Sequence, residues 1–348
     1  MRRKIAVFLL IFICLFSVLA ANKTVTVKPS GGTYTTLQGA ITGELVANAN
    51  LVTMEGILTI SIEGDWTDAP DTTAVTINGF TTSATYYLKI VTDSANRAVK
   101  TGIDTTRYIL AVTDDDAIDI RDDYVRIDGL QIQSIYVAAD YKAGIITQSI
   151  AATNNDIRIS NCYIEGSSTA YYYGIRFTDG DEIASVWNTI ISTFSVGINF
   201  PACTGNVFNS IVYNIGTDGI FVTLGATVSL INNAIFSCAD DIDDRASSTI
   251  DYNATDDNDG TNNVDETGGI GLTWADSYPD AATGNFTLKV GSPLIGAGAV
   301  DPGSGLFSDD IEGNTRGVAW DLGVDEYVAA VGGLSIPVAQ AYYRRFRN

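Results

Sequence analysis

Histidine is absent from all 348 residues, and cysteine, methionine and proline are scarce. Without histidine there is no Ser-His or Cys-His catalytic triad, no histidine-ligated zinc and no histidine general base. Beyond Cys14, which lies in the apolar start of the chain, only Cys162, Cys203 and Cys238 remain. Their odd number and wide spacing match neither a disulfide framework nor a zinc site. We therefore expect three small, buried side chains.

Positive charge is scarce as well. The chain has 20 Lys and Arg against 41 Asp and Glu, a net charge of −21, and removal of Arg2, Arg3 and Lys4 would make it −24. Such a surface repels nucleic acid and anionic lipid, so neither is expected as a partner. It also disfavours polyanionic substrates unless a cation bridges them. The simplest interpretation is a charge that keeps the protein soluble.

Residues 1–20 are typical of a secretory signal peptide. Three basic residues precede an apolar run over 5–16, and Val18 and Ala20 are permissive or small residues at the −3 and −1 positions. The run is short against the about 20 residues that span a bilayer. We expect cleavage, a mature chain without a stable membrane span, and a secreted, extracellular or cell-surface location.

The stretch Ala117–Ile235 repeats two signals. The first is a small residue, an apolar residue and usually a second apolar residue two positions later, and the second is an apolar alternation that ends in Gly or Asn. The first signal begins at Ala117, Gly144, Gly174, Gly197 and Gly219, and the second ends at Gly129, Asn161, Asn188, Asn209 and Asn232. The asparagines are 27, 21 and 23 residues apart. Two linked signals with a period in the twenties predict a solenoid.

Apolar residues two apart indicate short strands, with no 3.6-residue period between them. Strands that stack coil upon coil make an all-β, single-stranded parallel β-helix. Asparagine at one repeated corner suits a turn that needs a left-handed residue, and stacked copies can bond amide to amide. The pattern resembles the right-handed parallel β-helix (pectin-lyase-like) superfamily. A right-handed coil is implied by this resemblance and by the crossover rule.

The rest of the chain extends and closes the repeat. We expect an N-terminal cap over 21–56, coils over 57–284, a closing segment over 285–327 and a tail over 328–348. Earlier strands are predicted at 24–27, 58–62, 75–77, 87–91 and 108–112, and a short amphipathic helix over 35–46 with Thr36 near its start.

Residues 285–327 resemble the closing segment of secreted bacterial β-helix proteins, the choice-of-anchor type. The matching stretches are Asn285–Gly298, Asp310–Arg316 and Asp321–Tyr327. Arg316 is expected to pair with Asp310, Asp321 or Glu326 and to hold this segment together.

The resemblance implies where chemistry would lie. Lyases of the superfamily hold uronates with Asp-bound Ca²⁺ and abstract a proton with Arg or Lys, whereas the Gly-His-Gly segment of galacturonan hydrolases is absent here. Five residues are candidates for such a lyase centre: Arg158, Arg176, Lys142, Asp179 and Asp181. Surface charge is the alternative, and Arg126 and Arg158, at equivalent positions of successive copies, suit a structural ladder with a neighbouring Asp.

Two further motifs suggest binding. Tyr171, Tyr172 and Tyr173 run into a predicted strand, and an exposed aromatic face could stack on a sugar, although packing under a loop explains them too. Asp257, Asp259 and Glu266 have part of the spacing of an EF-hand loop. Calcium is therefore the one cofactor that the sequence suggests, with a plain acidic loop as the alternative.

These observations favour a secreted or cell-surface β-helix protein without catalytic activity that binds polysaccharide, a cell-surface glycan or another surface. A Ca²⁺-dependent polysaccharide lyase acting on uronates is one alternative. A structural component resembling a fibre or tail spike is the other.

Overall fold

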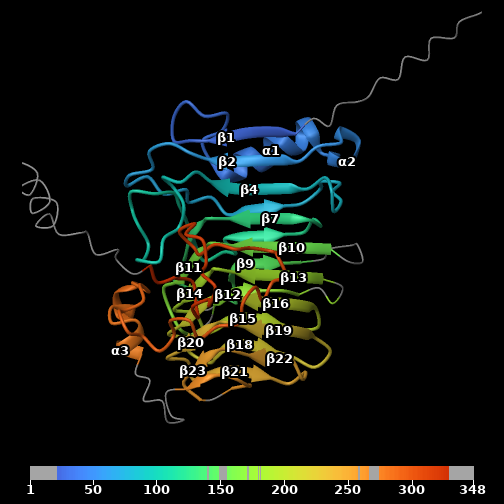
Figure 1. Cartoon of the computed structure of the whole chain (residues 1–348). Coiled ribbons are helices and arrows are strands. Elements are labelled where there is room, and N and C mark those ends of the chain that lie inside the picture. Colours follow the sequence, from blue (N-terminus) through green and yellow to red (C-terminus); the bar gives the residue numbers. More distant parts are fainter. Residues whose placement is uncertain are drawn as a thin grey trace, which may run out of the picture.

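A computed structural model describes residues 22–138, 141–148, 155–170, 172–178, 180, 182–257, 259–265 and 274–328. Their strands form three sheets of nine, eight and seven strands, here called sheets I, II and III. Every pairing between named strands is parallel, and from Leu88 to Asp251 the chain passes through sheets I, II and III in turn. The chain is therefore an all-β, three-faced parallel β-helix (Figure 1). Its right-handed sense remains a prediction.

The strand bounds are as follows. Sheet I contains β1 (Lys23–Val27), β2 (Leu58–Ile62), β4 (Leu88–Thr92), β7 (Val125–Asp128), β10 (Asn155–Ser160), β13 (Glu182–Trp187), β16 (Thr204–Phe208), β19 (Thr227–Ile231) and β22 (Thr249–Asp251). Sheet II contains β5 (Ile109–Thr113), β8 (Gln131–Ile135), β11 (Tyr163–Gly166), β14 (Ile190–Ser192), β17 (Ile211–Tyr213), β20 (Ala234–Phe236), β23 (Ala254–Thr255) and β24 (Val264–Asp265). Sheet III contains β3 (Val75–Ile77), β6 (Ile118–Ile120), β9 (Ala143–Thr147), β12 (Tyr173–Arg176), β15 (Val196–Phe200), β18 (Asp218–Val222) and β21 (Asp240–Asp244).

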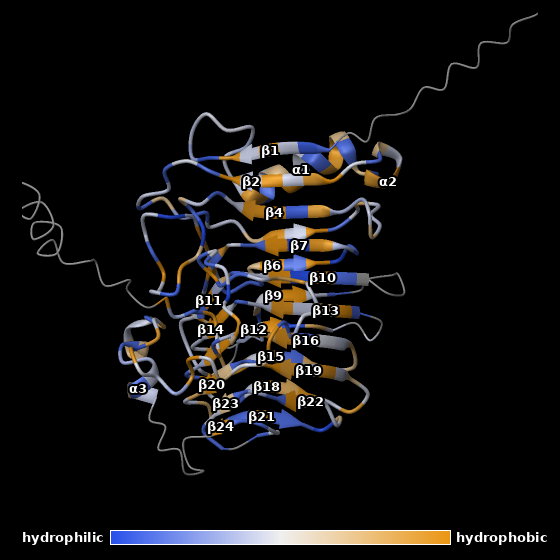
Figure 2. Cartoon of the chain, viewed as in Figure 1, coloured by the Kyte–Doolittle hydropathy of each residue, from blue (hydrophilic) through white to orange (hydrophobic). Residues whose placement is uncertain are grey.

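The core consists of apolar columns that run from coil to coil. Ile60, Ile90, Ile127 and Ile159 lie in register on four adjacent strands of sheet I, and all four side chains are buried. Figure 2 shows hydrophobic residues following one another from strand to strand in this way. Each such isoleucine contributes about 1.5–3 kcal/mol by its burial, so the repeat supplies its own core.

The small residue at the start of each repeat, usually glycine, lies in sheet III. A β-carbon at Gly174 would come within 2.6 Å of the Gly197 carbonyl oxygen on the next coil, and one at Gly144 within 2.7 Å of the Gly174 oxygen. Neither position has room for a side chain. The repeated glycine is therefore required by the close approach of consecutive coils.

The asparagine corner between sheets I and II confirms the sequence prediction. Asn161, Asn188, Asn209 and Asn232 all have positive φ, between 45° and 64°. Asn188 Nδ2 donates to Asn161 Oδ1 at 3.2 Å, and Asn232 Nδ2 donates to Asn209 Oδ1 at the same distance. Asparagine tolerates the left-handed conformation, and its amide then bonds to the next copy.

A helix covers the N-terminal coil, as predicted. Helix α1 (Leu37–Asn48) packs against β1, β2 and β3, and the Thr36 hydroxyl caps it by accepting from Gly39 N at 3.1 Å. Ile41 is buried in the core, whereas Val46 is 87% exposed. A second short helix, α2 (Leu51–Met54), follows.

The C-terminal residues 274–328 lie along the side of the coil. They begin with α3 (Trp274–Ser277) and the 3-10 turn η1 (Ala281–Thr283) and then continue without regular structure. Phe286, Leu294 and Leu322 form one apolar cluster with Tyr163 and Ile211 of sheet II, so this segment covers the outer face of that sheet (Figure 1).

Cys162 and Cys203 are buried as predicted, and Cys238 is partly buried. In the described part of the chain, no helix is long and apolar enough to cross a membrane. The proposed signal peptide (1–20) and, apart from Val328, the tail lie outside the described residues.

Candidate functional site

Three basic side chains form one column on the outer face of sheet I. Lys89 of β4, Arg126 of β7 and Arg158 of β10 are aligned in register on adjacent strands. Parallel strands lie about 4.8 Å apart, so the column concentrates positive charge. We call these three residues the cationic column.

Asp156 separates the charges of the two arginines. Its Oδ2 lies 2.7 Å from Arg126 Nη2 and 2.7 Å from Arg158 Nη2, and its Oδ1 accepts from Arg158 Nε at 3.0 Å. Burial lowers the pKa of Arg126, and Asp156 counteracts that change. The Arg126 guanidinium also lies over the Tyr87 ring, 5.1 Å from its centre. The arginine pair thus keeps a net positive charge in a fixed position.

Lys89 has no such partner. Among the lysines and arginines that the structure describes, only Lys89 and Arg176 form no ion pair. An unpaired cation is notable in a chain with a net charge of −21. Lys89 is therefore free to bind an anion.

The cationic column lines a groove. A hollow of about 190 Å³ is bounded by the column and by Tyr87, Asp128, Ser160, Trp187 and Leu306. A second hollow of about 810 Å³ shares the last four of these residues and extends between sheet I and residues 301–320. Its volume lies within the range of about 300–1,000 Å³ that is usual for ligand pockets. The groove therefore has sheet I as its floor and the C-terminal segment as one wall.

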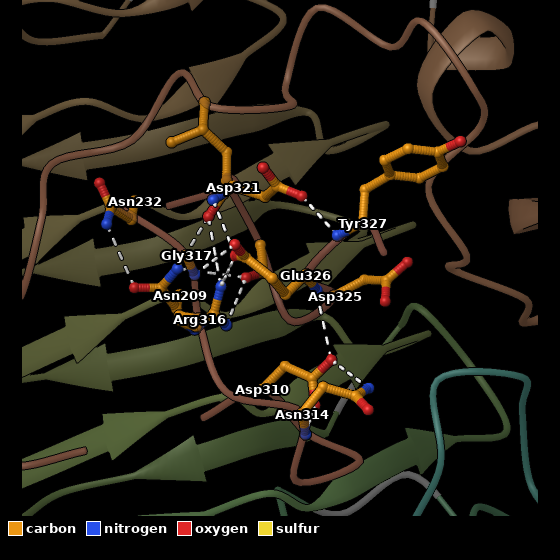
Figure 3. A network of polar contacts seen from close by, with 12 residues as sticks. Asn209, Asn232, Asp310, Asn314, Arg316, Gly317, Asp321, Asp325, Glu326 and Tyr327 are labelled. Atoms are coloured by element: carbon orange, nitrogen blue, oxygen red, sulfur yellow. Dashed lines mark hydrogen bonds and ion pairs between the residues drawn. The ribbon is translucent and has the colours of Figure 1, made fainter. Parts of the chain in front are cut away.

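Arg316 fastens this wall by bonding to the asparagine column, the stack of corner residues Asn161, Asn188, Asn209 and Asn232 (Figure 3). Its Nη2 donates to Asn188 Oδ1 at 2.8 Å, and its Nη1 lies 3.4 Å from Glu326 Oε2. Asn209 Nδ2 donates to the Asp321 carbonyl at 2.9 Å. Asn161 bonds to Asn188, and Asn209 bonds to Asn232. Where the next amide-to-amide bond would lie, between Asn188 and Asn209, the C-terminal segment supplies the partners instead. Among the partners that the sequence suggested for Arg316, the ion pair forms with Glu326.

A second group of charges lies at the exposed edge of sheet III. Carboxylate oxygens of Asp240, Asp257 and Asp259 lie within 4.8 Å of one another, and we call these residues the acidic cluster. Asp257 Oδ2 accepts from Asp241 N at 3.3 Å, and Asp259 Oδ2 accepts from Ile242 N at 3.1 Å. Two carboxylates therefore cap N–H groups of β21, the outermost strand of sheet III among the described residues.

Burial and mutual repulsion change the acidity of this region. Burial, with a hydrogen bond and the charge of Asp257, raises the pKa of Asp259 to about 7. Burial also raises the pKa of Asp241 to about 8, with the charges of Asp256 and Asp257 adding to the effect. Three carboxylates at this spacing have the hard oxygen donors that Ca²⁺ prefers. Of the predicted calcium ligands, Asp257 and Asp259 come together, Asp240 was missed, and Glu266 lies outside the described residues.

The predicted lyase residues are divided between sheets. Arg158 belongs to sheet I, whereas Arg176 lies on β12 of sheet III, with its guanidinium 4.7 Å from the centre of the Tyr173 ring. Lys142 Nζ lies 3.5 Å from Asp115 Oδ1, beside sheet III. Asp179 and Asp181 fall outside the described residues. The candidates that are described do not share one groove.

The tyrosine run is mostly engaged in packing. Tyr172 is 1% exposed, and its hydroxyl donates to Asp114 Oδ1 at 3.2 Å. Tyr173 is half-buried beneath Arg176, and Tyr171 lies outside the described residues. The aromatic residues that line the groove, Tyr87 and Trp187, were not singled out from the sequence.

Comparison with known proteins adds little about function. No family model matches the chain, and no curated protein matches its sequence. The solved structures that resemble it include the crystal structure of pectate lyase Pel9A, with a TM-score of 0.41 and 11% sequence identity over 90% of this chain and 98% of that one. At this level of similarity the likeness carries no argument about activity.

Proposed function

We propose that the chain binds an acidic polysaccharide, one with carboxylate groups, in the groove of sheet I. The observation that carries the proposal is the cationic column, with an unpaired Lys89, inside a groove of a strongly acidic chain. Because the column runs across the strands, along the axis of the coil, a chain-like ligand would meet several cations in succession.

The groove offers two kinds of contact. The Lys89 ammonium and the outward nitrogens of Arg158, whose side chain is 38% exposed, suit sugar carboxylates. Tyr87 lines the groove and is half-buried, so its ring can contact the apolar face of a sugar ring. A ligand with both features, carboxylate and ring, fits better than a small inorganic anion.

The net charge does not rule out this partner. Charges separated by more than about 8 Å are largely screened at physiological salt. Beside the cationic column the carboxylates are already engaged: Asp156 pairs with the two arginines, and Asp128 accepts from Asn161 Nδ2 at 2.6 Å. We accordingly expect binding that weakens as salt concentration rises.

We propose a binding role because, among the described residues, the one group of carboxylates spaced to hold a metal ion lies outside the groove. The acidic cluster belongs to the edge of sheet III, whereas the cationic column belongs to sheet I. A lyase remains the alternative because Lys89 in the groove is a residue of the type that abstracts the proton in such lyases. Ultraviolet absorbance of the unsaturated product, measured with Ca²⁺ and with chelator, distinguishes the two: a growing signal establishes the lyase, and a flat trace supports binding alone.

Secretion or display at the cell surface belongs to the same proposal, since polysaccharides of this kind are outside the cell. The signal-like residues 1–20 support it. The fibre-like alternative predicts a stable oligomer, which sedimentation in solution would reveal.

The binding experiment uses two variants that remove the same charge. Lys89→Ala and Arg176→Ala each delete an unpaired cation, but only Lys89 lines the groove. We expect Lys89→Ala to weaken binding to polygalacturonate about tenfold, which is about 1.4 kcal/mol, and Arg176→Ala to leave it unchanged. Neutral polysaccharides serve as controls. Equal losses in both variants, or no binding of any acidic polysaccharide by the wild type, would overturn the proposal.

A further inference from the structure

The floor of the groove changes from polar to aromatic along one row. Asp128, Ser160, Trp187 and Phe208 occupy aligned positions on consecutive strands of sheet I. Ile231 of β19 is the next residue of the row. The polar part of the row lines both hollows of the groove, and Trp187 continues it. The groove therefore leads directly onto an aromatic surface.

That surface forms one buried cluster with Phe307 and Trp320 of the C-terminal segment, and the Phe307 ring stacks on it. The Phe307 ring lies 5.9 Å from the Trp187 ring at an angle of 18°, and 6.5 Å from the Phe208 ring at 25°. Phe307 is 7% exposed in this position. A flat ring laid almost parallel on two aromatic side chains takes the arrangement that a sugar ring adopts on such side chains.

The loop that carries Phe307 is held to sheet I without hydrogen bonds. Within residues 300–307, which are all described, the hydrogen bonds are internal: Gly305 N donates to Asp301 Oδ1 at 2.7 Å, and Leu306 N donates to Gly303 O at 3.1 Å. The loop meets the sheet through apolar contacts of Leu306 and Phe307.

Both ends of the loop are fixed. Ala299 N donates to Asn232 Oδ1 at 2.7 Å, and the Ser308 carbonyl accepts from Arg316 N at 2.9 Å. Phe307 can therefore leave the sheet while the segments on either side stay bonded. The loop has the properties of a lid: firm hinges and a contact with the floor that depends on side-chain packing alone.

We infer that Trp187 and Phe208 form a further sugar-binding subsite of the groove, which Phe307 occupies until a long polysaccharide displaces it. This inference rests on the proposed function. Short ligands fill the part of the groove beside the cationic column and leave Phe307 in place. Longer ligands continue along the row and stack a ring where Phe307 was. Because Phe307 competes with them, it lowers their apparent affinity by the fraction of time it covers the subsite.

The test measures binding of oligogalacturonates of increasing length to three variants. Phe307→Ala removes the competing ring and is expected to bind long oligomers about tenfold more tightly, with short oligomers unaffected. Val300→Ala, an exposed position in the same loop, is the matched control and should bind all lengths as the wild type does. Adding Trp187→Ala to Phe307→Ala should remove the gain. An absence of any length-dependent gain in Phe307→Ala overturns the inference.

A second measurement uses the unaltered protein, so it does not depend on how well a variant folds. Hydrogen exchange of residues 300–307 should speed up on binding of long oligomers and stay constant with short ones. Exchange that slows with long oligomers contradicts displacement. The two proposals can be refuted separately. If the wild type binds no acidic polysaccharide, the proposed function is refuted. If it binds them but the exchange of residues 300–307 does not change, only the subsite is refuted.

Discussion

The cationic column on sheet I and the acidic cluster on sheet III both concentrate charge of one sign, but they are built in different ways. In a parallel coil, one position of each turn lies beside the same position of the next turn, so a charge that recurs is brought within about 5 Å of its copy. Lys89, Arg126 and Arg158 line up in this way, whereas Asp240 of β21 meets Asp257 and Asp259 from a later part of the chain. The two regions have opposite signs and differ in how the charge is balanced.

The cationic column contains its own counterion. Asp156 lies between Arg126 and Arg158 and bonds to both. The acidic cluster has no cation among its three carboxylates, and burial with like charge raises the pKa of Asp259 to about 7. Charge of one sign is concentrated in both places. A built-in opposite charge makes the first a stable binding surface, whereas the second has an affinity for protons or cations.

Removing the counterion should have the largest effect. Asp156→Ala leaves Arg126, whose side chain is 11% exposed, beside Arg158 without neutralisation. We expect a loss of about 2 kcal/mol in the free energy of unfolding, less than the roughly 3–5 kcal/mol for a fully buried pair. Urea denaturation measures it. The control is Asp243→Ala, which breaks the exposed pair with Arg245 and should cost much less, because solvent screens that pair. Equal losses in the two variants would contradict a special role for Asp156.

Calcium should have the next largest effect. If Ca²⁺ binds Asp240, Asp257 and Asp259, a concentration ten times its dissociation constant stabilises the fold by about 1.4 kcal/mol. Thermal denaturation at pH 8, with Ca²⁺ and then with chelator, measures the change. Asp259→Asn should abolish the response, and Asp65→Asn, at an exposed turn near the other end of the coil, should retain it. A melting temperature that Ca²⁺ does not alter excludes the site.

The pH dependence should be smaller. The folded-state pKa values of Asp241, about 8, and Asp259, about 7, lie above the ordinary value. The folded state therefore binds more protons than the unfolded state, so this contribution is full below about pH 4 and is lost as pH rises through 7–8. We expect a loss of about 1 kcal/mol between pH 5 and pH 8 without calcium, after allowance for solvent screening. Asp259→Asn should reduce the slope and leave the part that Asp241 contributes, and an unchanged slope would show that Asp259 does not titrate in this range.

Much of the coil could be predicted from the sequence. The strands expected at 58–62 and 75–77 have those bounds in the structure, and the asparagines occupy the left-handed corner. These features depend on alternation and on single-residue turn preferences, which are local. Val46 shows the limit, because it lies on the exposed side of α1 although it is apolar.

The candidate site could be predicted only in part. Arg126 and Arg158 are aligned copies 32 residues apart, and their equivalence is visible in the sequence. Lys89 lies 37 residues before Arg126, and a long loop in that coil hides their common register. Asp257 and Asp259 were recognised from their spacing, whereas Asp240 joins them from a separate strand. Variable loop length conceals register, and side chains from different coils meet only after stacking.

The sequence by itself determined the solenoid, since each turn carries its own apolar alternation, its glycine and its corner asparagine, and stacking needs only the neighbouring turn. Tertiary structure decided the groove. Phe307 lies 120 residues from Trp187, and Arg316 lies 128 residues from Asn188, yet each pair is in contact. The segment that supplies them has no repeat. Its position depends on apolar contacts with the outer face of sheet II and on the single guanidinium of Arg316, which bonds to the asparagine corner between its two hydrogen-bonded pairs.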